Sequence, residues 1–341
     1  MVTNELYKSN YLDIKKEEWN NFVENSLSGW FWHTSFFLDA WPYGNNISFA
    51  IRDDKEILAI CSLWLNSGRM TRRIFYIFKQ IATEHTLFSL GGIAVKDGLG
   101  KKHKNRIISF FKIVIDGLMH QYGCCNFEIV SASLPPILFP ENNIHYNPLI
   151  FWGFKNISEH TYIIDLNNSN EEEIKNDFSN TTKLQIRKII DDKSYSFREA
   201  KPCKEDLDLY YKLHCETYTR TGTTPHPISY FKHIFSEIME KGFCRVLFAF
   251  KYGEIVAAQN TLSYKGASFY WTGASITEKD NGVNKYLFYS QIMYAKRKGD
   301  RYYEIGEIFP YERDGKLKGL TQFKSSFGGN IYPVYKGKFV Y

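Results

Sequence analysis

The chain has 341 residues, which is too long for one average domain and enough for two. Its hydrophobic fraction of 44% and its charged fraction of 23% are ordinary for a soluble globular protein. The net charge of +6 fits an anionic ligand such as a nucleotide or phosphate, but it lies far below the charge of a dedicated nucleic-acid-binding protein. Basic residues scattered over the surface for solubility explain the same charge equally well.

The sequence predicts neither export nor membrane insertion. Residues 1–19 carry charges throughout and lack the apolar segment of a signal peptide, and no run of about twenty apolar residues occurs. The six cysteines form no CxxC pair, and the adjacent Cys124 and Cys125 are too close for an ordinary disulfide or zinc site. We therefore expect reduced thiols in a cytoplasmic protein without a membrane span.

The first half of the chain begins with an amphipathic pattern that predicts a helix at residues 17–28. The aromatic-dense segment 29–41 follows, and it is either core or the wall of a cleft, with core favoured. The elements expected after it are a hairpin (47–51 and 57–65), a strand at 72–81, a strand at 86–95 with a glycine bulge, a helix at 105–122, a strand at 126–131 and a proline-rich connector at 132–160.

The second half repeats this alternation of helices and strands. The expected elements are strands at 162–166 and 196–199, helices at 171–192, 204–220 and 228–241, a meander at 244–250, 254–264 and 267–271, a helix at 284–298, a strand at 301–305 and one or two strands in the tail. Each half therefore reads as helix, antiparallel meander, strand, helix and strand. This order predicts a mixed α/β (α+β) fold with a central sheet.

Two stretches of the first half are echoed in the second. A helix-like segment is followed by a glycine and, five residues later, by a glutamate, as Gly123 and Glu128 and again as Gly299 and Glu304. Upstream of each, a similar hairpin sequence occurs at residues 49–60 and 248–258. The repetition predicts two related lobes, which we place at residues 1–150 and 151–341, with a ligand-binding cleft between them.

Four segments resemble a known family. They are NTTKLQIRKII at 180–190, RTGTTPHPISYF at 220–231, GEIVAAQNTLSYKGASFYWTGAS at 253–275 and GLTQFKSSFGG at 319–329. Together they resemble the Fem-type peptidyltransferases and related single-chain proteins of the acetyltransferase (GNAT) superfamily. The resemblance implies two acetyltransferase-like lobes in tandem and transfer of an acyl or aminoacyl group onto an amine. It implies acyl-CoA or aminoacyl-tRNA as co-substrate and no tightly bound cofactor.

The resemblance also implies roles for particular residues. In the final motif of the family, a Phe-Lys pair is held to lie at the transfer centre, and here the pair is Phe323 and Lys324. The lysine would stabilise the negative charge that develops on the carbonyl oxygen. The arginine of the basic helix motif is associated with a phosphate of the acceptor, and here it would be Arg187.

One departure from the superfamily concerns the loop that normally holds the CoA pyrophosphate. The second lobe has only Asp-Asn-Gly-Val at 280–283 before its helix, which lacks the required glycine spacing. The first lobe has Gly98, Gly100 and Lys101 in this position, whose amides and ammonium could hold a phosphate. A solvated basic turn is the alternative interpretation.

The proton acceptor of the reaction is left open by the sequence. Glu304 and Glu307 are ranked equally as the base, although either could instead bind sugar hydroxyls. His226 lies between two prolines that stiffen its loop, which suits a catalytic or a plain turn residue. Further substrate-binding candidates are His85 and Ser89 in the first lobe, and Tyr270 and Trp271, of which only one should face the cleft.

The function expected is therefore an N-acyltransferase that acts on an amino group of a cell-envelope precursor, such as a nucleotide-linked amino sugar. The alternatives are an aminoacyl-tRNA-dependent peptidyltransferase of peptidoglycan bridge synthesis, with tRNA as a partner, and an inactive nucleotide-sugar-binding relative. No Cys/His cluster has metal-ligand spacing, so no metal is expected. The identity of the acyl group, the acceptor sugar and the oligomeric state do not follow from the sequence.

Overall fold

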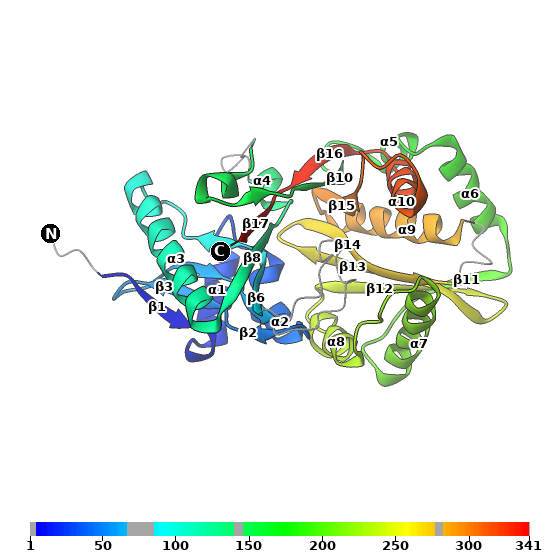
Figure 1. Ribbon diagram of the computed structural model, residues 1–341. Coiled ribbons are helices and arrows are strands. Elements are labelled where there is room, and N and C mark those ends of the chain that lie inside the picture. The colour runs from blue at the N-terminus through cyan, green and yellow to red at the C-terminus, as the bar shows by residue number, and fades with distance from the viewer. Residues whose placement is uncertain (1–4, 67–84, 140–145, 277–281, 341) are drawn as a thin grey trace. The chain divides into compact units, whose positions relative to one another are not determined.

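The computed structural model describes residues 5–66, 85–139, 146–276 and 282–340. Contacts divide the chain into two compact units, of which the first holds Met1–Glu159 with Val334–Tyr341 and the second holds His160–Pro333 (Figure 1). The strand expected at residues 72–81 lies outside the described residues. Within the described ranges, no helix is both long and apolar enough to cross a membrane.

The first unit contains two sheets. Its elements are β1 (Tyr7–Asn10), α1 (Lys16–Asn25), α2 (Ser35–Ala40), β2 (Asn45–Asn46), β3 (Phe49–Arg52), β4 (Ile57–Cys61), β5 (Trp64–Asn66), β6 (His85–Gly91), β7 (Ile93–Val95), α3 (Lys101–Tyr122), β8 (Cys124–Ser131), α4 (Pro135–Leu138), a 3₁₀ helix (Pro148–Trp152), β9 (Lys155–Asn156) and β17 (Lys336–Val340). The strand orders are β1-β3-β4-β7 and β2-β5-β6-β8-β17-β9.

The core of the first unit forms on one face of α3. Apolar residues recur every three or four positions along this helix, so they share a face. Ile107, Phe111 and Ile115 are buried in a cluster with residues of β3, β6 and β8. The helix begins four residues earlier than the expected start at 105 and ends at Gly123, whose φ of 60° belongs to the left-handed region.

The aromatic segment at residues 29–41 belongs to the core. Phe31 and Phe37 are completely buried, and Trp30 and Trp41 are nearly so. The rings of Phe37 and Trp41 lie 5.4 Å apart between centroids, and both rings contact Trp64 of β5. The preference for a core role over a cleft wall is therefore confirmed for these four residues.

The second unit contains one sheet. Its elements are β10 (Glu159–Asp165), α5 (Glu171–Asn176), α6 (Asn180–Asp191), β11 (Tyr195–Glu199), α7 (Lys204–Arg220), α8 (Ile228–His233) with a π-helical turn (Ile234–Ile238), β12 (Cys244–Lys251), β13 (Glu254–Tyr264), β14 (Ala267–Ser275), α9 (Val283–Lys298), β15 (Tyr302–Ile308), α10 (Gly315–Ser325) and β16 (Asn330–Val334). The strand order is β11-β12-β13-β14-β15-β10-β16.

Helices cover both faces of this sheet. Figure 1 shows α7 and α8 on one face and α6, α9 and α10 on the other. Neighbouring residues of β14 reflect the two layers, because Tyr270 contacts the Phe288 ring of α9 and Trp271 contacts the Tyr230 ring of α8. Alternate side chains of a strand point to opposite faces, so this division is expected.

Two helical segments differ from the sequence-based expectation. The single helix expected at 171–192 is two helices, since Ser179 accepts a hydrogen bond from the Thr182 backbone N–H and so caps the start of α6. The segment 315–325 was not expected to be helical, yet it forms α10.

The repeat detected in the sequence corresponds to a repeated structural element. In each unit a long helix ends at a left-handed glycine, Gly123 or Gly299, and leads into a strand, β8 or β15. That strand pairs in parallel with an earlier strand, so β8 lies beside β6 and β15 beside β14. The repeated glutamates take equivalent places, with Glu128 opposite Phe88 and Glu304 opposite Phe269.

The end of the chain does not follow the expected boundaries of 1–150 and 151–341. Strand β17 pairs with β8 and β9, so the last residues belong to the first unit. The Nζ atom of Lys338 lies 2.9 Å from Oε1 of Glu128, which is only 3% exposed. Burial raises the pKa of Glu128, and the hydrogen bond and charge of Lys338 together with the charge of Lys336 oppose this rise.

Replacing Lys338 with methionine should destabilise the first unit, because it leaves the Glu128 carboxylate buried without its cation. The expected loss in the free energy of unfolding is about 2 kcal/mol near neutral pH. The loss should shrink as the pH falls through the pKa of Glu128, since a protonated carboxyl needs no cation. Urea unfolding at neutral and acidic pH measures both effects.

The matched control is Lys155→Met, which removes an exposed lysine opposite Lys338 on β9. Equal free energies of unfolding of the two variants at neutral pH would show that the Glu128–Lys338 ion pair does not stabilise the pairing of β17 with β8.

Candidate active site

Lys324 is a buried lysine on a mostly solvent-facing helix. It lies near the end of α10 and is 5% exposed. Its Nζ donates a hydrogen bond of 2.7 Å to the backbone oxygen of Glu307 and lies 5.8 Å from the centroid of the Tyr270 ring. Burying an ammonium group costs free energy unless opposite charges or hydrogen-bond acceptors lie beside it, so Lys324 needs such groups nearby.

Two carboxylates supply that compensation. Burial lowers the pKa of Lys324 to about 8, and the charges of Glu307 and Glu304 act in the opposite direction. Both glutamates come from β15, whose pairing with β10 shifts by one residue between Tyr162 and Ile163. Because of this bulge, residues three apart on β15 can approach the same ammonium, which strict alternation would prevent.

Gly306 makes room for the ammonium inside the bulge. Its φ of +92° lies in a region that residues with a side chain rarely adopt. A Cβ atom at this position would lie 3.2 Å from Nζ of Lys324 and 3.5 Å from the ring of Tyr270. The glycine between Glu304 and Glu307 therefore fixes the strand shape that brings carboxylates, ring and ammonium together.

The site lies where two parallel strands stop pairing. The pairing of β14 with β15 covers Ala267–Phe269 and Tyr302–Glu304 only. Tyr270 follows directly, and its partly buried ring lies on the α9 face near Lys324. Trp271 is the extra residue of a second irregularity, between β13 and β14, and contacts α8 instead. Tyr270 is therefore the member of this pair whose ring lies beside Lys324.

His226 belongs to a separate cluster on the α8 face. Its backbone N–H donates to Nε2 of His214, and its ring lies 5.1 Å from the ring of Tyr230, which in turn contacts Trp271. Burial lowers the pKa of His226 to about 4. Burial and the charge of His226 lower the pKa of His214 to about 3, so both rings are neutral near pH 7.

His214 was not singled out in the sequence. It is completely buried in α7, and its Nδ1 has no hydrogen-bond partner among the described residues. A single histidine inside an amphipathic helix carries no spacing signal, and only the fold places it against His226.

The motif residues Phe323 and Arg187 lie in different surroundings. Phe323 packs against the rings of Phe288 and Phe327 and supports the core next to Lys324. Arg187 lies on α6 with its side chain 82% exposed, and its Nε is 3.8 Å from Asp191. Among the described residues, Arg187 pairs with Asp191, whereas Lys324 contacts Glu307 and Tyr270.

The candidates of the first unit do not form one cluster either. His85 is exposed at the start of β6, whereas Ser89 is completely buried with its hydroxyl 3.8 Å from the Cys61 sulfur. Gly98, Gly100 and Lys101 lie in the loop before α3 and in its first turn. The three are consistent with an accessible anion-binding loop, and their role stays a prediction. No group of three metal-ligating side chains is found among the described residues.

Comparisons with known proteins bear on the family and on the fold. The family model of the acetyltransferase (GNAT) domain matches residues 176–324. No curated protein matches the chain in sequence. The solved structure of FemX gives a TM-score of 0.69 at 14% identity and covers 98% of this chain and 97% of its own.

Two further structures share the fold. A tandem GNAT protein from the clavulanic acid biosynthesis pathway gives a TM-score of 0.57 at 10% identity, with 98% of each chain covered. The C-terminal domain of a protein named as a lysylphosphatidylglycerol synthetase, from Agrobacterium fabrum, gives 0.56 at 13% identity and covers 95% of this chain and 91% of its own.

The matched region contains the whole cluster built above. Tyr270, Glu304 and Glu307 lie within it, and Lys324 is its last residue. The solved tandem GNAT structure covers 98% of the chain, so the similarity in fold extends to the first unit as well. Residues 176–324 match the GNAT acetyltransferase domain, which indicates that the chain is an acyltransferase, and the chain as a whole shares the fold of FemX and of the tandem GNAT protein.

Proposed function

We propose that this chain transfers an acyl or aminoacyl group onto an amino group of a cell-envelope precursor, such as a nucleotide-linked amino sugar. The observation that carries the proposal is the buried Lys324 ammonium beside Glu304 and Glu307 in the GNAT domain. A cytoplasmic place of action is part of the proposal, because acyl-CoA and aminoacyl-tRNA are cytoplasmic donors.

The reaction forms one bond and breaks another. The nitrogen of the acceptor amine attacks the carbonyl carbon of the donor, and the bond from that carbon to the donor sulfur or oxygen breaks. The amine loses a proton to a base, and the leaving thiol or hydroxyl regains one. The chain must therefore stabilise the carbonyl oxygen as it gains charge and provide a group that accepts the proton.

Lys324 suits the first task. An ammonium has three N–H donors, and within the described residues Lys324 uses one of them for the backbone oxygen of Glu307. Two donors are left for a developing oxyanion. The pKa of about 8 keeps the side chain mostly charged at neutral pH, and burial makes its interaction with a nearby negative charge strong.

Glu304 and Glu307 are the proposed proton acceptors, and the two are still ranked equally. Both act on the Lys324 charge, so both lie near the proposed transfer centre. His226 is the third candidate, and its low pKa makes it a weak base. Phe323, Tyr270, Trp271 and Arg187 are proposed to hold the acceptor, while His85, Ser89 and the loop of Gly98, Gly100 and Lys101 are proposed ligand contacts of the first unit.

The identity of the acyl donor distinguishes the leading proposal from its first alternative, the aminoacyl-tRNA-dependent peptidyltransferase. A peptidyltransferase that depends on aminoacyl-tRNA would lose activity when the reaction mixture is treated with ribonuclease, and a CoA-dependent enzyme would not. An inactive relative would bind a nucleotide-linked amino sugar without turnover with any donor.

Lys324→Met should lower kcat by about 10²- to 10³-fold, because it removes an oxyanion donor from a buried site. The assay combines the purified chain with nucleotide-linked amino sugars and panels of acyl-CoA and aminoacyl-tRNA donors. Lys318→Met is the matched control, since this lysine is exposed on the same helix. Equal turnover of the two variants would falsify the assigned role of Lys324.

Activity and stability should respond to alkaline pH in opposite directions. Turnover should fall as the pH rises through about 8, because the oxyanion donor is lost when Lys324 deprotonates. The free energy of unfolding should gain up to about 3 kcal/mol from this group between pH 8 and 10.5, because the unfolded state binds the proton more tightly there.

The pH dependence is measured with turnover profiles and with urea unfolding of the wild type and Lys324→Met. The gain in stability should be absent from the variant. Two results together would show that Lys324 does not titrate in this range. They are a wild-type turnover that does not change across pH 8, and a free energy of unfolding that changes with pH by the same amount in the wild type and the variant.

Arg187→Ala should raise the KM for a phosphate-bearing acceptor and leave kcat nearly unchanged. A phosphate contact of this exposed arginine would contribute equally to binding in the ground state and in the transition state. Lys188→Ala, the exposed neighbour on α6, is the control for the loss of one positive charge. The same KM change in both variants would point to a general charge effect in place of a phosphate contact at Arg187.

A further inference from the structure

The second unit contains a polar pocket that the proposed reaction does not use. Its volume of about 220 Å³ is below the range for drug-sized ligands, about 300–1,000 Å³, so it suits one small metabolite. Its walls are the end of β11, the start of β12 with the turn before it, the end of β13 and the last turns of α9. In the described part of the chain, its lining does not include Lys324, Glu304 or Glu307.

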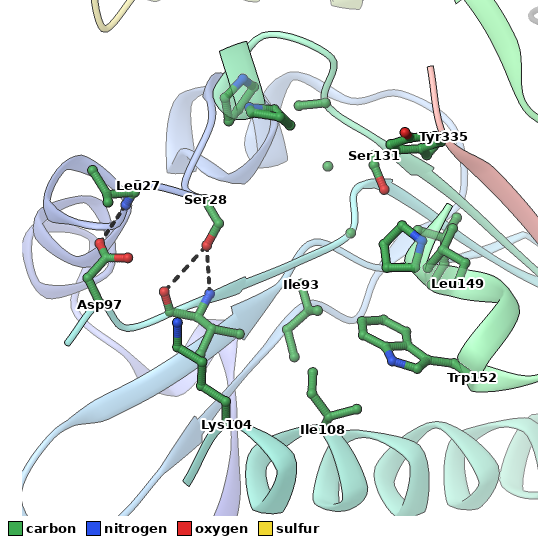
Figure 2. A pocket seen from close by; sticks show the side chains of 18 residues that line it. Leu27, Ser28, Ile93, Asp97, Lys104, Ile108, Ser131, Leu149, Trp152 and Tyr335 are labelled. Carbon is green, nitrogen blue, oxygen red and sulfur yellow. Dashed lines mark hydrogen bonds between the residues drawn. The ribbon is translucent and has the colours of Figure 1, made fainter. Parts of the chain in front are cut away.

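This pocket differs in character from the larger cavity of the first unit, which Figure 2 shows. There, Ile93, Ile108 and Trp152 belong to mostly apolar walls. In the second unit, Arg245 and Ser263 are among the lining residues. Charged and hydroxyl groups select a ligand by its own charges and hydrogen bonds, so the chemistry of the occupant can be inferred for the polar pocket.

Arg245, in β12, is held in one position by three neighbours. Its Nε donates a hydrogen bond of 2.7 Å to Oε1 of Glu199, and its Nη1 donates one of 2.7 Å to Oε1 of Gln291. Its Cζ lies 4.2 Å from the centroid of the Tyr294 ring. The side chain is only 15% exposed. The guanidinium is therefore already ordered where it meets the pocket.

Arg245 has hydrogen-bond donors to spare. A guanidinium has five N–H groups, and the described residues accept from two of them, so three remain. A mostly buried guanidinium has lost much of its water, and leaving these donors unpaired costs free energy. A carboxylate can accept from Nη1 and Nη2 side by side, so this edge of Arg245 favours a carboxylate.

The pocket also contains hydrogen-bond acceptors. The Ser268 hydroxyl donates to Oδ2 of Asp300, because an ionised carboxylate can only accept. The hydroxyl oxygens of Ser263 and Ser268 lie 2.6 Å apart, so Ser263 must donate its proton to Ser268. The Ser263 oxygen therefore keeps lone pairs for a donor in the pocket. Oε2 of Glu199 likewise has no hydrogen-bond partner among the described residues.

We propose that this pocket binds a free α-amino acid of moderate size with an apolar side chain. The carboxylate of the ligand accepts from Arg245, and the exposed Lys298 adds a second positive charge at the rim. The ammonium of the ligand donates to Ser263 and to the second carboxylate oxygen of Glu199. The apolar residues of the wall, which contact the ligand side chain, are Ala200, Pro202, Met239 and Val246.

A simple anion matches the pocket less well than a zwitterion. The carboxylate of Glu199 lies against Arg245 and offsets part of its charge, and its second oxygen would repel an anion. An α-amino acid has no net charge and satisfies the donors and the acceptors together. The proposal does not depend on the chemistry of Lys324.

Isothermal titration calorimetry with the dialysed full chain tests the proposal, with L-leucine, L-methionine and L-valine as probes. At least one of them should bind. Its N-acetyl derivative lacks the ammonium and its amide lacks the carboxylate, so each should bind about tenfold more weakly or worse, because polar groups of the pocket stay unpaired. Absence of binding by all three probes would overturn the proposal, and so would a derivative that binds as tightly as its parent.

Two substitutions with matched controls locate the ligand. Arg245→Lys keeps the charge but loses the planar fork, and Ala200→Phe fills the pocket, so each should weaken binding about tenfold or more. Arg297→Lys, at an exposed arginine of α9, and Ser196→Phe, at an exposed position of β11, should bind like the wild type. Circular dichroism shows which variants fold.

Ser263→Ala removes a single hydroxyl and keeps the test decisive if the larger changes do not fold. It should weaken binding several-fold, and Ser196→Ala is its control. Weaker binding by at least one folded pocket variant, with its control unchanged, supports the proposal. Unchanged binding by every folded pocket variant, or equal weakening in each variant and its control, would overturn it.

Lys324→Met distinguishes this pocket from the proposed transfer centre. The variant should bind the amino acid like the wild type, since Lys324 does not belong to the described lining of the pocket. Loss of binding in Lys324→Met, with unchanged binding in the pocket variants, would place the amino acid at the transfer centre and overturn the proposal.

Discussion

The burial of one ammonium group constrains the second unit more than any other interaction described. An unpaired buried charge costs several kcal/mol, so Lys324 can lie inside the protein only if acceptors and opposite charges reach it. The backbone oxygen of Glu307 and the two carboxylates of β15 meet this need. They reach it because of the bulge opposite Tyr162 and the glycine at 306, so strand irregularity and buried charge depend on each other.

The two units contain the same structural element with different side chains at one place. Each has a long helix, a left-handed glycine and a strand that pairs in parallel and then separates from its neighbour. In the second unit a cation and a tyrosine ring lie at the separation, which suits a polar reaction centre. In the first unit, the residues around this separation are mainly apolar, among them Ile93, Ile129 and Trp152. The side chains at this point therefore differ between the two units, although the backbone element is the same.

Much of this could be predicted from the sequence, because periodicity and the glycine signals report local structure directly. The repeat, the helix at 204–220 and the break at Gly91 and Gly92 all follow from such signals. The return of β17 to the first unit could not be predicted, since it depends on long-range pairing. The family motif pointed to Lys324, but its burial and its carboxylate neighbours depend on a bulge that leaves no sequence pattern.

The state of the Lys324 ammonium is the most direct test of this account. Nuclear magnetic resonance of protein labelled at the lysine side chains gives the pKa of each lysine, and comparison with Lys324→Met assigns the signal. The account predicts one lysine that titrates near pH 8, clearly apart from the others, and that is missing in the variant. If every lysine of the wild type titrates at the usual value near 10.5, Lys324 is not held as described here, and the proposed reaction centre fails with it.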